Sequence, residues 1–158
     1  MSLRIPSQDG MWEVGVAAVA NAFAGTVYST VFNVKNYKST VFLIHKAVGA
    51  TGTATITVEG CTDTSGTGAT AVPFRYRVAT TLDTFGDVTL ATTSGFTTTA
   101  GSNQLYEITV DNDVLGNGGF NFIRLKSVEV VASAVLGGVI AYLGQPRYPQ
   151  ATQATALS

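Results

Sequence analysis

The chain has 158 residues, of which 46% are hydrophobic and only 12% are charged, and its formal net charge at pH 7 is −1. This length suits a single domain with a sizeable core. Charged residues are about half as frequent as in an ordinary soluble domain, which indicates a surface partly covered by neighbours in an assembly. The nine basic residues are scattered and form no basic stripe, so we expect no nucleic-acid partner.

The composition also argues against disulfide bonds, secretion and membrane insertion. Cys61 is the only cysteine, which excludes an internal disulfide. The apolar run from Val14 to Ala24 resembles a signal-peptide core, but Asp9 and Glu13 precede it where such a peptide carries basic residues. No run approaches the roughly 20 apolar residues of a membrane span, so no membrane partner is expected.

Residues 1–24 are predicted to form an extended N-terminal arm. Residues 1–12 contain Pro6 and Gly10 and show no periodicity. Residues 13–24 are rich in alanine, which favours a helix, whereas Gly15 and the valines disfavour one. A short helix and an arm lying on a neighbouring surface both remain open for this second part.

The clearest pattern in the chain lies between residues 37 and 59. Within 41–46, Phe42 and Ile44 alternate with Leu43 and His45, and the same period of two recurs within 53–59. Such alternation, rich in β-branched residues, is typical of half-buried strands. Two glycines in the sequence Gly-Ala-Thr-Gly separate the two segments at 49–52, so we predict a β-hairpin with a short turn.

The same alternation continues toward the C-terminus. Further strands are predicted at 26–34, 72–78, 86–91, 104–111, 120–133 and 136–143. Glycine- and threonine-rich connections at 60–70 and 92–102, and a turn at 111–119, separate them. Eight or nine strands with almost no helical signal predict an all-β fold, a two-sheet β-sandwich of the jelly-roll type. We place this domain at 25–144 and a polar C-terminal tail at 145–158.

His45 and Cys61 are the residues best suited to acid–base or nucleophilic chemistry. His45 is the only histidine and lies in mid-strand between apolar neighbours, which favours a structural or interface role over that of a base or a metal ligand. In the predicted hairpin the two residues lie on the order of 20 Å apart. We therefore expect no catalytic dyad.

The sequence Asp111-Asn112-Asp113 invites comparison with a calcium-binding loop. The fifth and twelfth positions of that template, however, are occupied by Leu115 and Phe122, so the bidentate carboxylate is missing. A turn capped by Asp or Asn side chains is the simpler prediction.

The remaining candidate residues do not form a recognisable site. The glycines at 66–68 lack the context of a nucleotide-binding loop, and Arg75 and Arg77 share one strand face, which suits ion pairs or a subunit contact. Trp12 and the dispersed tyrosines mark no sugar-binding platform. The scattered carboxylates that a glycosidase would have to bring together are Glu59, Asp63, Asp83, Asp87, Glu107 and Glu129. We predict no enzymatic activity and no catalytic, cofactor or metal site.

Four segments carry a resemblance to a known group of proteins. They are NYKSTVFLIHKAVGATGTATITVEGC at 36–61, AVPFRYRV at 71–78, TTSGFTTTAGSNQLYEITVDNDVL at 92–115 and GFNFIRLKSVEVV at 119–131. Together they resemble small virion proteins of tailed bacteriophages over roughly residues 26–143. The resemblance implies a structural protein of the phage head, in the class of jelly-roll decoration or cement proteins. Such proteins sit on the outside of the shell and bind the major capsid protein, and the family has no catalytic residues to transfer.

Two alternatives remain open at this point. The chain is either a structural component of the neck, tail or fibre base, or a carbohydrate-binding jelly-roll module. Under the leading hypothesis it is made in the cytoplasm of the bacterial host and resides on the capsid exterior. Its partners are then the major capsid protein and other copies of itself, as a dimer or trimer.

Overall fold

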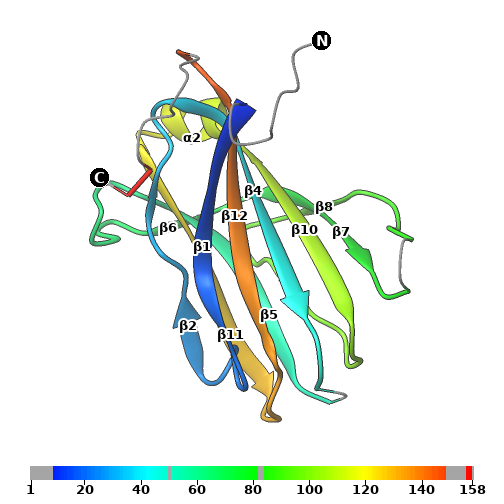
Figure 1. Ribbon diagram of the computed structural model, residues 1–158. Helices are drawn as coiled ribbons and strands as arrows, with labels where there is room; N and C mark the ends of the chain where they lie inside the picture. The colour runs from blue at the N-terminus through cyan, green and yellow to red at the C-terminus, as the bar shows by residue number, and fades with distance from the viewer. Residues whose placement is uncertain (1–8, 50, 82–83, 149–155, 158) are drawn as a thin grey trace.

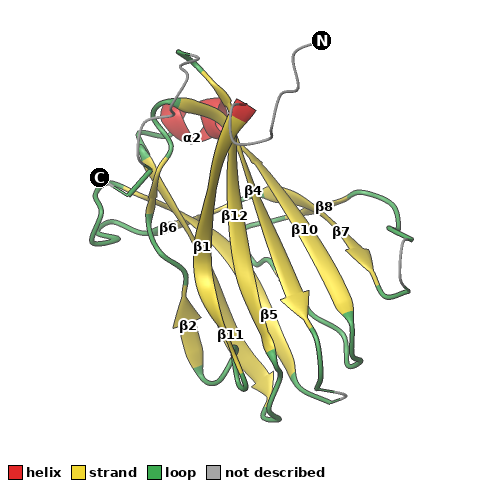
Figure 2. Cartoon of the chain, in the orientation of Figure 1, coloured by secondary structure: helices red, strands yellow, loops and turns green. Residues whose placement is uncertain are grey.

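The computed structural model describes residues 9–49, 51–81, 84–148 and 156–157. Two β-sheets face each other, and one short helix, α2 (Asn112–Asn117), closes one end of the sandwich (Figures 1 and 2). Sheet A consists, in spatial order, of β1 (Gly10–Val19), β12 (Gly137–Pro146), β4 (Tyr37–Lys46), β10 (Gln104–Asp111), β7 (Phe74–Ala79) and β8 (Thr89–Ala91). Sheet B consists of β2 (Thr26–Tyr28), β11 (Phe122–Val131), β5 (Thr53–Cys61) and β6 (Thr70–Val72), with β3 (Phe32–Asn33) added beside β11 and β9 (Phe96–Thr97) beside β5.

The order of the strands is that of a jelly roll. The chain crosses between the sheets after β1, β3, β4, β6, β8, β9, β10 and β11, and the strand pairs within each sheet are antiparallel. Four strands of each sheet, β1-β12-β4-β10 and β2-β11-β5-β6, form the two halves of the roll, and β7 and β8 widen sheet A. The predicted all-β sandwich is therefore confirmed.

The predicted alternation places the correct side chains in the core. The inner faces of β4, β5, β10 and β11 bury the residues that the period of two assigns to one side. Examples are Phe42, Ile44, Ile56, Val58, Tyr106, Ile108, Ile123 and Leu125. Beside them the rings of Tyr76 and Phe96 stack at 4.0 Å between centroids, so aromatic packing fills the space between the sheets near β7 and β9.

The hairpin prediction for residues 37–59 is wrong. β4 lies in sheet A and β5 in sheet B, so the chain passes between the sheets in an arch, here called the 47–52 arch, of which residues 47–49 and 51–52 are described. This arch pairs with a second one at 132–136, where Ala47 N–H donates to Leu136 O. A methyl group on Gly52 would lie 2.4 Å from Ser133 O. Glycine at this position therefore allows the two arches to pack closely. A hairpin turn would also require glycine here, so the sequence alone does not distinguish the two structures.

The strand predicted at 72–78 is also two strands. Pro73 separates β6 in sheet B from β7 in sheet A. Proline has no N–H to donate to a ladder, which makes it suitable for the crossing point. The strand predicted at 26–34 is likewise divided into β2 and β3, and at the break Thr30 N–H donates to Gly15 O of β1.

The arm predicted at residues 1–24 is wrong wherever the structure describes it. Gly10–Val19 forms β1, which pairs with β12, and Ala22 and Phe23 are buried. Register shifts between Val14 and Val19 interrupt the ladder and hide the alternation that would have indicated a strand. The sandwich therefore begins at Gly10, while residues 1–8 lie outside the described residues.

The predicted tail at 145–158 is partly built into the fold. β12 continues to Pro146, and Ala156 is fully buried, with Asn33 N–H donating to its carbonyl oxygen. Residues 149–155 and 158 lie outside the described residues. No helix among the described residues is long and apolar enough to cross a membrane.

Candidate interaction surfaces

The outer side of sheet A carries a contiguous group of apolar side chains, here called the apolar face. It consists of Trp12, Val14, Val41, Leu43, Ile140 and Tyr142. The register places these residues in two rows across β1, β12 and β4, because Trp12, Tyr142 and Val41 are neighbours in one row and Val14, Ile140 and Leu43 in the next. Val14 is 62% exposed, Trp12 48% and Ile140 46%. Contiguous exposed apolar side chains of this kind mark interaction sites more often than isolated ones do.

Two glycines shape the aromatic end of the apolar face. The rings of Trp12 and Tyr142 lie 4.6 Å apart between centroids. Beside them, Gly10 and Gly144 pair across β1 and β12, and a methyl group on either would come within 2.6 or 2.8 Å of the Tyr142 ring. The Tyr142 ring therefore packs directly against the backbone of these two glycines, which keeps the aromatic pair close to the surface of the sheet.

Charged side chains border the apolar face on β10 and β7. Arg77 donates to both carboxylate oxygens of Glu107, at 3.2 and 2.8 Å, and its guanidinium lies 4.5 Å from the centre of the Phe85 ring. The hydrogen bonds and charge of Glu107 raise the pKa of Arg77 above its ordinary value. Arg75 is exposed and has no ion pair among the described residues. The sequence-based expectation of an ion pair is confirmed for Arg77 alone.

A second apolar surface, here called the end groove, lies beside α2 at one end of the sandwich. It encloses about 440 Å³ between α2 and strands β6, β7, β8 and β10. Its apolar lining comes from Val72, Pro73, Leu90, Val114, Leu115 and Phe120. Leu90 and Val114 are 69% and 60% exposed, and Arg75 and Asp111 contribute polar groups to the lining. The end groove meets the border of the apolar face at Arg75.

The sequence Asp111-Asn112-Asp113 positions α2 and does not form a cation site in the described structure. Asp111 caps the helix by accepting a hydrogen bond from Asp113 N–H at 2.9 Å. Asn112 is buried, accepts from the Thr40 hydroxyl and donates to a backbone carbonyl of β4. Asp113 pairs with Arg147. The three side chains are thus used separately, as the predicted capped turn requires, and the described residues contain no cluster of metal-ligating side chains.

His45 and Cys61 lie in different sheets. His45 is exposed on the outer side of sheet A, where it pairs across strands with Leu105 and Gly138. Cys61 is fully buried in β5 of sheet B, and this burial raises the pKa of its thiol. The hairpin from which their separation was predicted does not exist, but the two-sheet arrangement keeps them apart.

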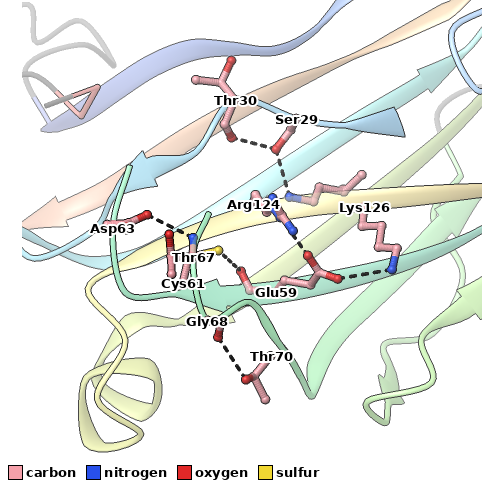
Figure 3. Close-up of polar contacts among 11 residues, drawn as sticks. Ser29, Thr30, Glu59, Cys61, Asp63, Thr67, Gly68, Thr70, Arg124 and Lys126 are labelled. Atoms are coloured by element: carbon pink, nitrogen blue, oxygen red, sulfur yellow. Dashed lines mark hydrogen bonds and ion pairs between the residues drawn. The ribbon is translucent and has the colours of Figure 1, made fainter. Parts of the chain in front are cut away.

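The outer side of sheet B carries a cluster of ion pairs (Figure 3). Glu59 accepts from Arg124 at 2.7 Å and pairs with Lys126 at 3.5 Å, and the ring of Tyr28 lies 4.2 Å from the Arg124 guanidinium. In the adjoining 60–70 loop the Asp63 carboxylate accepts hydrogen bonds from the N–H groups of Ser65 and Thr67. Hydrogen bonding to the Thr67 side chain, and then to these N–H groups, lowers the pKa of Asp63. These charges stabilise one another, so this face contrasts with the apolar face of sheet A.

Several of the scattered carboxylates are held by other groups in the described part of the chain. Glu59 and Glu107 lie on the outer sides of opposite sheets, and each pairs with arginine. Glu129 accepts from Gly25 N–H, and Asp83 lies outside the described residues. The glycines at 66–68 lie in a surface loop where a side chain on Gly66 would collide with Arg124.

Sequence reasoning missed the apolar face as a unit. Trp12 and Val14 were assigned to an arm, and Ile140 and Tyr142 to a strand with no known neighbour. The only signal was the alternation of Trp12 and Val14 with Met11 and Glu13, which is too short to distinguish a strand from a loop.

Comparison with known proteins adds little to this geometry. No protein-family model and no curated protein matches the chain. Among solved structures, the chain is similar to the crystal structure of YomS, a protein derived from the SPBc2 prophage. The TM-score is 0.44 and the sequence identity 14%, over 84% of this chain and 93% of that chain. At these values the similarity carries no argument about fold or function.

Proposed function

We propose that this chain is a structural virion protein of a tailed bacteriophage, and specifically a decoration or cement protein that binds the outside of the major capsid protein lattice. One observation carries the proposal: a small, charge-poor jelly roll exposes two neighbouring apolar surfaces, the apolar face and the end groove. A component of a lattice needs one surface for the shell and another for its neighbours. The sequence resemblance to phage virion proteins supports the same function.

The end groove has the anatomy of a site for the capsid protein. Its centre is apolar, with Leu90 and Val114 exposed, and its polar groups are Arg75 and Asp111. Interfaces commonly combine an apolar centre with a polar rim. A loop of the capsid protein with one or two apolar side chains would displace water from this groove and be held in register by the Asp111 carboxylate at its rim.

Stabilisation of the head then follows from thermodynamic linkage. A protein that binds the assembled lattice, and not the separated subunits, raises the free energy of disassembly by RT ln(1 + [L]/Kd) at each site. Many copies on one shell make the collective effect large even when each contact is weak. The reaction is binding alone, and the proposal assigns no catalytic residue and no cofactor.

The decisive experiment is quantitative mass spectrometry of purified heads and tails. We expect on the order of one copy per one to three capsid subunits in heads, as symmetric lattice sites require. A handful of copies confined to tails would instead favour a neck, tail or fibre-base component.

The contact is tested by sedimenting purified protein with shells that lack it. Val114→Asp in the end groove is expected to weaken binding at least tenfold, because a carboxylate would be desolvated against apolar side chains. Val130→Asp is the matched control, since Val130 is exposed to a similar degree, 57% against 60%, but lies in sheet B. Equal binding by both variants would exclude the end groove as the contact.

A carbohydrate-binding function has one observation in its favour, the exposed pair Trp12 and Tyr142. Sugar recognition also requires polar groups around the aromatic platform, whereas Val14, Val41 and Ile140 surround this pair within the apolar face. A glycan array on which the wild type binds and Trp12→Ala does not would nevertheless establish this alternative.

A further inference from the structure

We propose that the apolar face is the interface between two copies of this chain, packed face to face about a two-fold axis that runs parallel to the strands above β4. This inference goes beyond the proposed function and does not depend on it, because it concerns the purified chain in solution. It rests on the register of sheet A, on the distribution of charge across the face and on the available area.

The register makes the two borders of the face complementary. Trp12, Tyr142, Val41, Thr109 and Arg75 form one continuous row across β1, β12, β4, β10 and β7. β1 and β7 each lie two strands from β4. A two-fold axis above β4 and parallel to the strands therefore places the β1 border of one copy opposite the β7 border of the other, within the same row.

The residues at these two borders attract each other. Trp12 is half exposed, and Arg75 is exposed without an ion pair among the described residues. In the proposed dimer each Trp12 ring faces the Arg75 guanidinium of the second copy, a favourable cation–π arrangement that occurs twice. This chain carries both the aromatic ring and the guanidinium of the contact. A second copy is therefore preferred over an unrelated partner.

The rest of the face meets itself without repulsion. Val41 and Leu43 lie on β4, under the axis, and carry no charge. The one acidic residue within the rows, Glu107, is neutralised by its two hydrogen bonds from Arg77. Like charges facing each other would oppose a symmetric contact, and this pairing avoids them.

The outer side of sheet A has enough area for a dimer when the apolar face and its charged border are taken together. The five strands from β1 to β7, about 4.8 Å apart and about eight residues long at about 3.3 Å per residue, cover roughly 600 Å². Two such sides bury about 1,200 Å² in total, the lower bound for specific interfaces.

The test uses Trp12, the only tryptophan of the chain, as its reporter. Analytical ultracentrifugation of the full chain is expected to show a monomer–dimer equilibrium. The tryptophan emission should shift to the blue, and quenching by acrylamide should decrease, over the same concentration range as dimer formation. A monomer at about 100 µM with a freely quenched tryptophan would overturn the proposal, and this readout requires no variant.

Variants identify the face. Val41 lies on β4 under the axis, so in Val41→Asp the carboxylates of the two copies would face each other, and this variant is expected to abolish the dimer. Val130→Asp, at an exposed valine of sheet B, is expected to leave the dimer intact. Arg75→Ala should raise the dimer Kd about 5- to 30-fold through loss of both cation–π contacts. A dimer that survives Val41→Asp, or one that Val130→Asp disrupts instead, would contradict the assignment. A wild-type monomer in which only Val41→Asp prevents binding to shells would assign the face to the capsid protein.

Discussion

The buried side chain of Asn112 links two elements of the fold through hydrogen bonds. Its amide bridges α2 to β4, accepting from the Thr40 hydroxyl at 3.0 Å and donating to Tyr37 O at 3.1 Å, and its side chain is almost fully buried. Lys46 plays a comparable part as the last residue of β4, where its side chain is 1% exposed and its amine donates to Thr99 O. Both residues interrupt an apolar pattern, and both satisfy buried carbonyl groups.

Asn112→Ala is predicted to lower the free energy of unfolding by about 1–3 kcal/mol, because it removes the hydrogen bonds that the buried amide makes with the Thr40 hydroxyl and the Tyr37 carbonyl. Urea denaturation measures the change. Val114→Ala, at an exposed position of the same helix, is the control and should change stability by no more than about 0.5 kcal/mol. Equal effects of the two substitutions would show that the buried amide is not important for stability.

Lys46 is predicted to make stability depend on pH. Burial lowers the pKa of its amine in the folded chain, so between this pKa and the ordinary value the unfolded chain binds more protons than the folded chain. The contribution of Lys46 to stability therefore increases as the pH rises through this range. We expect the free energy of unfolding of the wild type, relative to Lys46→Met, to increase as the pH is raised toward the ordinary lysine pKa of 10.5. Ionisation of Cys61 opposes this trend but is common to both proteins; parallel pH profiles would refute the prediction.

At the scale of elements, the arches and the Pro73 crossing determine which strands become neighbours. The 47–52 and 132–136 arches pair through Ala47, Val48 and Leu136, and they lie at the end of the sandwich opposite α2 (Figure 1). Each arch carries the chain from one sheet to the other. Their close packing keeps β4 beside β12 in one sheet while β5 lies beside β11 in the other.

Gly52→Ala is predicted to destabilise the protein by about 1–3 kcal/mol, because the new methyl group would collide with the backbone of Ser133 in the second arch. Gly116→Ala is the control, since a methyl group there meets no atom within 4 Å and alanine favours the helix by about 0.5–1 kcal/mol. Thermal or urea unfolding of both variants compares the two effects. A Gly52 variant as stable as the wild type would show that the arches can separate at little cost.

At the scale of the whole molecule, the two sheets give the protein two unlike outer sides. Sheet A presents the apolar face, whereas Glu59, Arg124 and Lys126 satisfy one another on sheet B. A particle whose two outer sides differ in this way associates in one orientation, as a component of an ordered surface must. β1 is essential to this asymmetry because it carries Trp12 and Val14.

Truncation separates the roles of the N-terminal residues. Deletion of residues 1–8 should leave the free energy of unfolding within about 1 kcal/mol of the wild type, because the pairing of β1 begins at Gly10. Deletion of residues 1–20 removes β1, exposes the edge of β12 and should prevent folding to a soluble product. Circular dichroism and urea denaturation check both. Under the proposed function, deletion of 1–8 also weakens attachment to shells, and unchanged attachment would exclude a role for these residues there.

The sequence by itself determined the strands and their inner faces. The alternation within 41–46, 104–111 and 122–127 depends only on whether each residue meets the core or the outside, a local property with a period of two. The Asp111 cap was equally visible, because it joins neighbouring residues.

Only the tertiary structure decided which strands pair and where a surface arises. Gly49 and Gly52 suit a hairpin and an arch alike, and residues 72–78 show one uninterrupted alternation although the chain changes sheets at Pro73. The apolar face combines residues 12–14, 41–43 and 140–142, which become neighbours only when β1, β12 and β4 pair. Alternation reports the two sides of a strand and not its partner, since pairing depends on contacts between residues far apart in the chain.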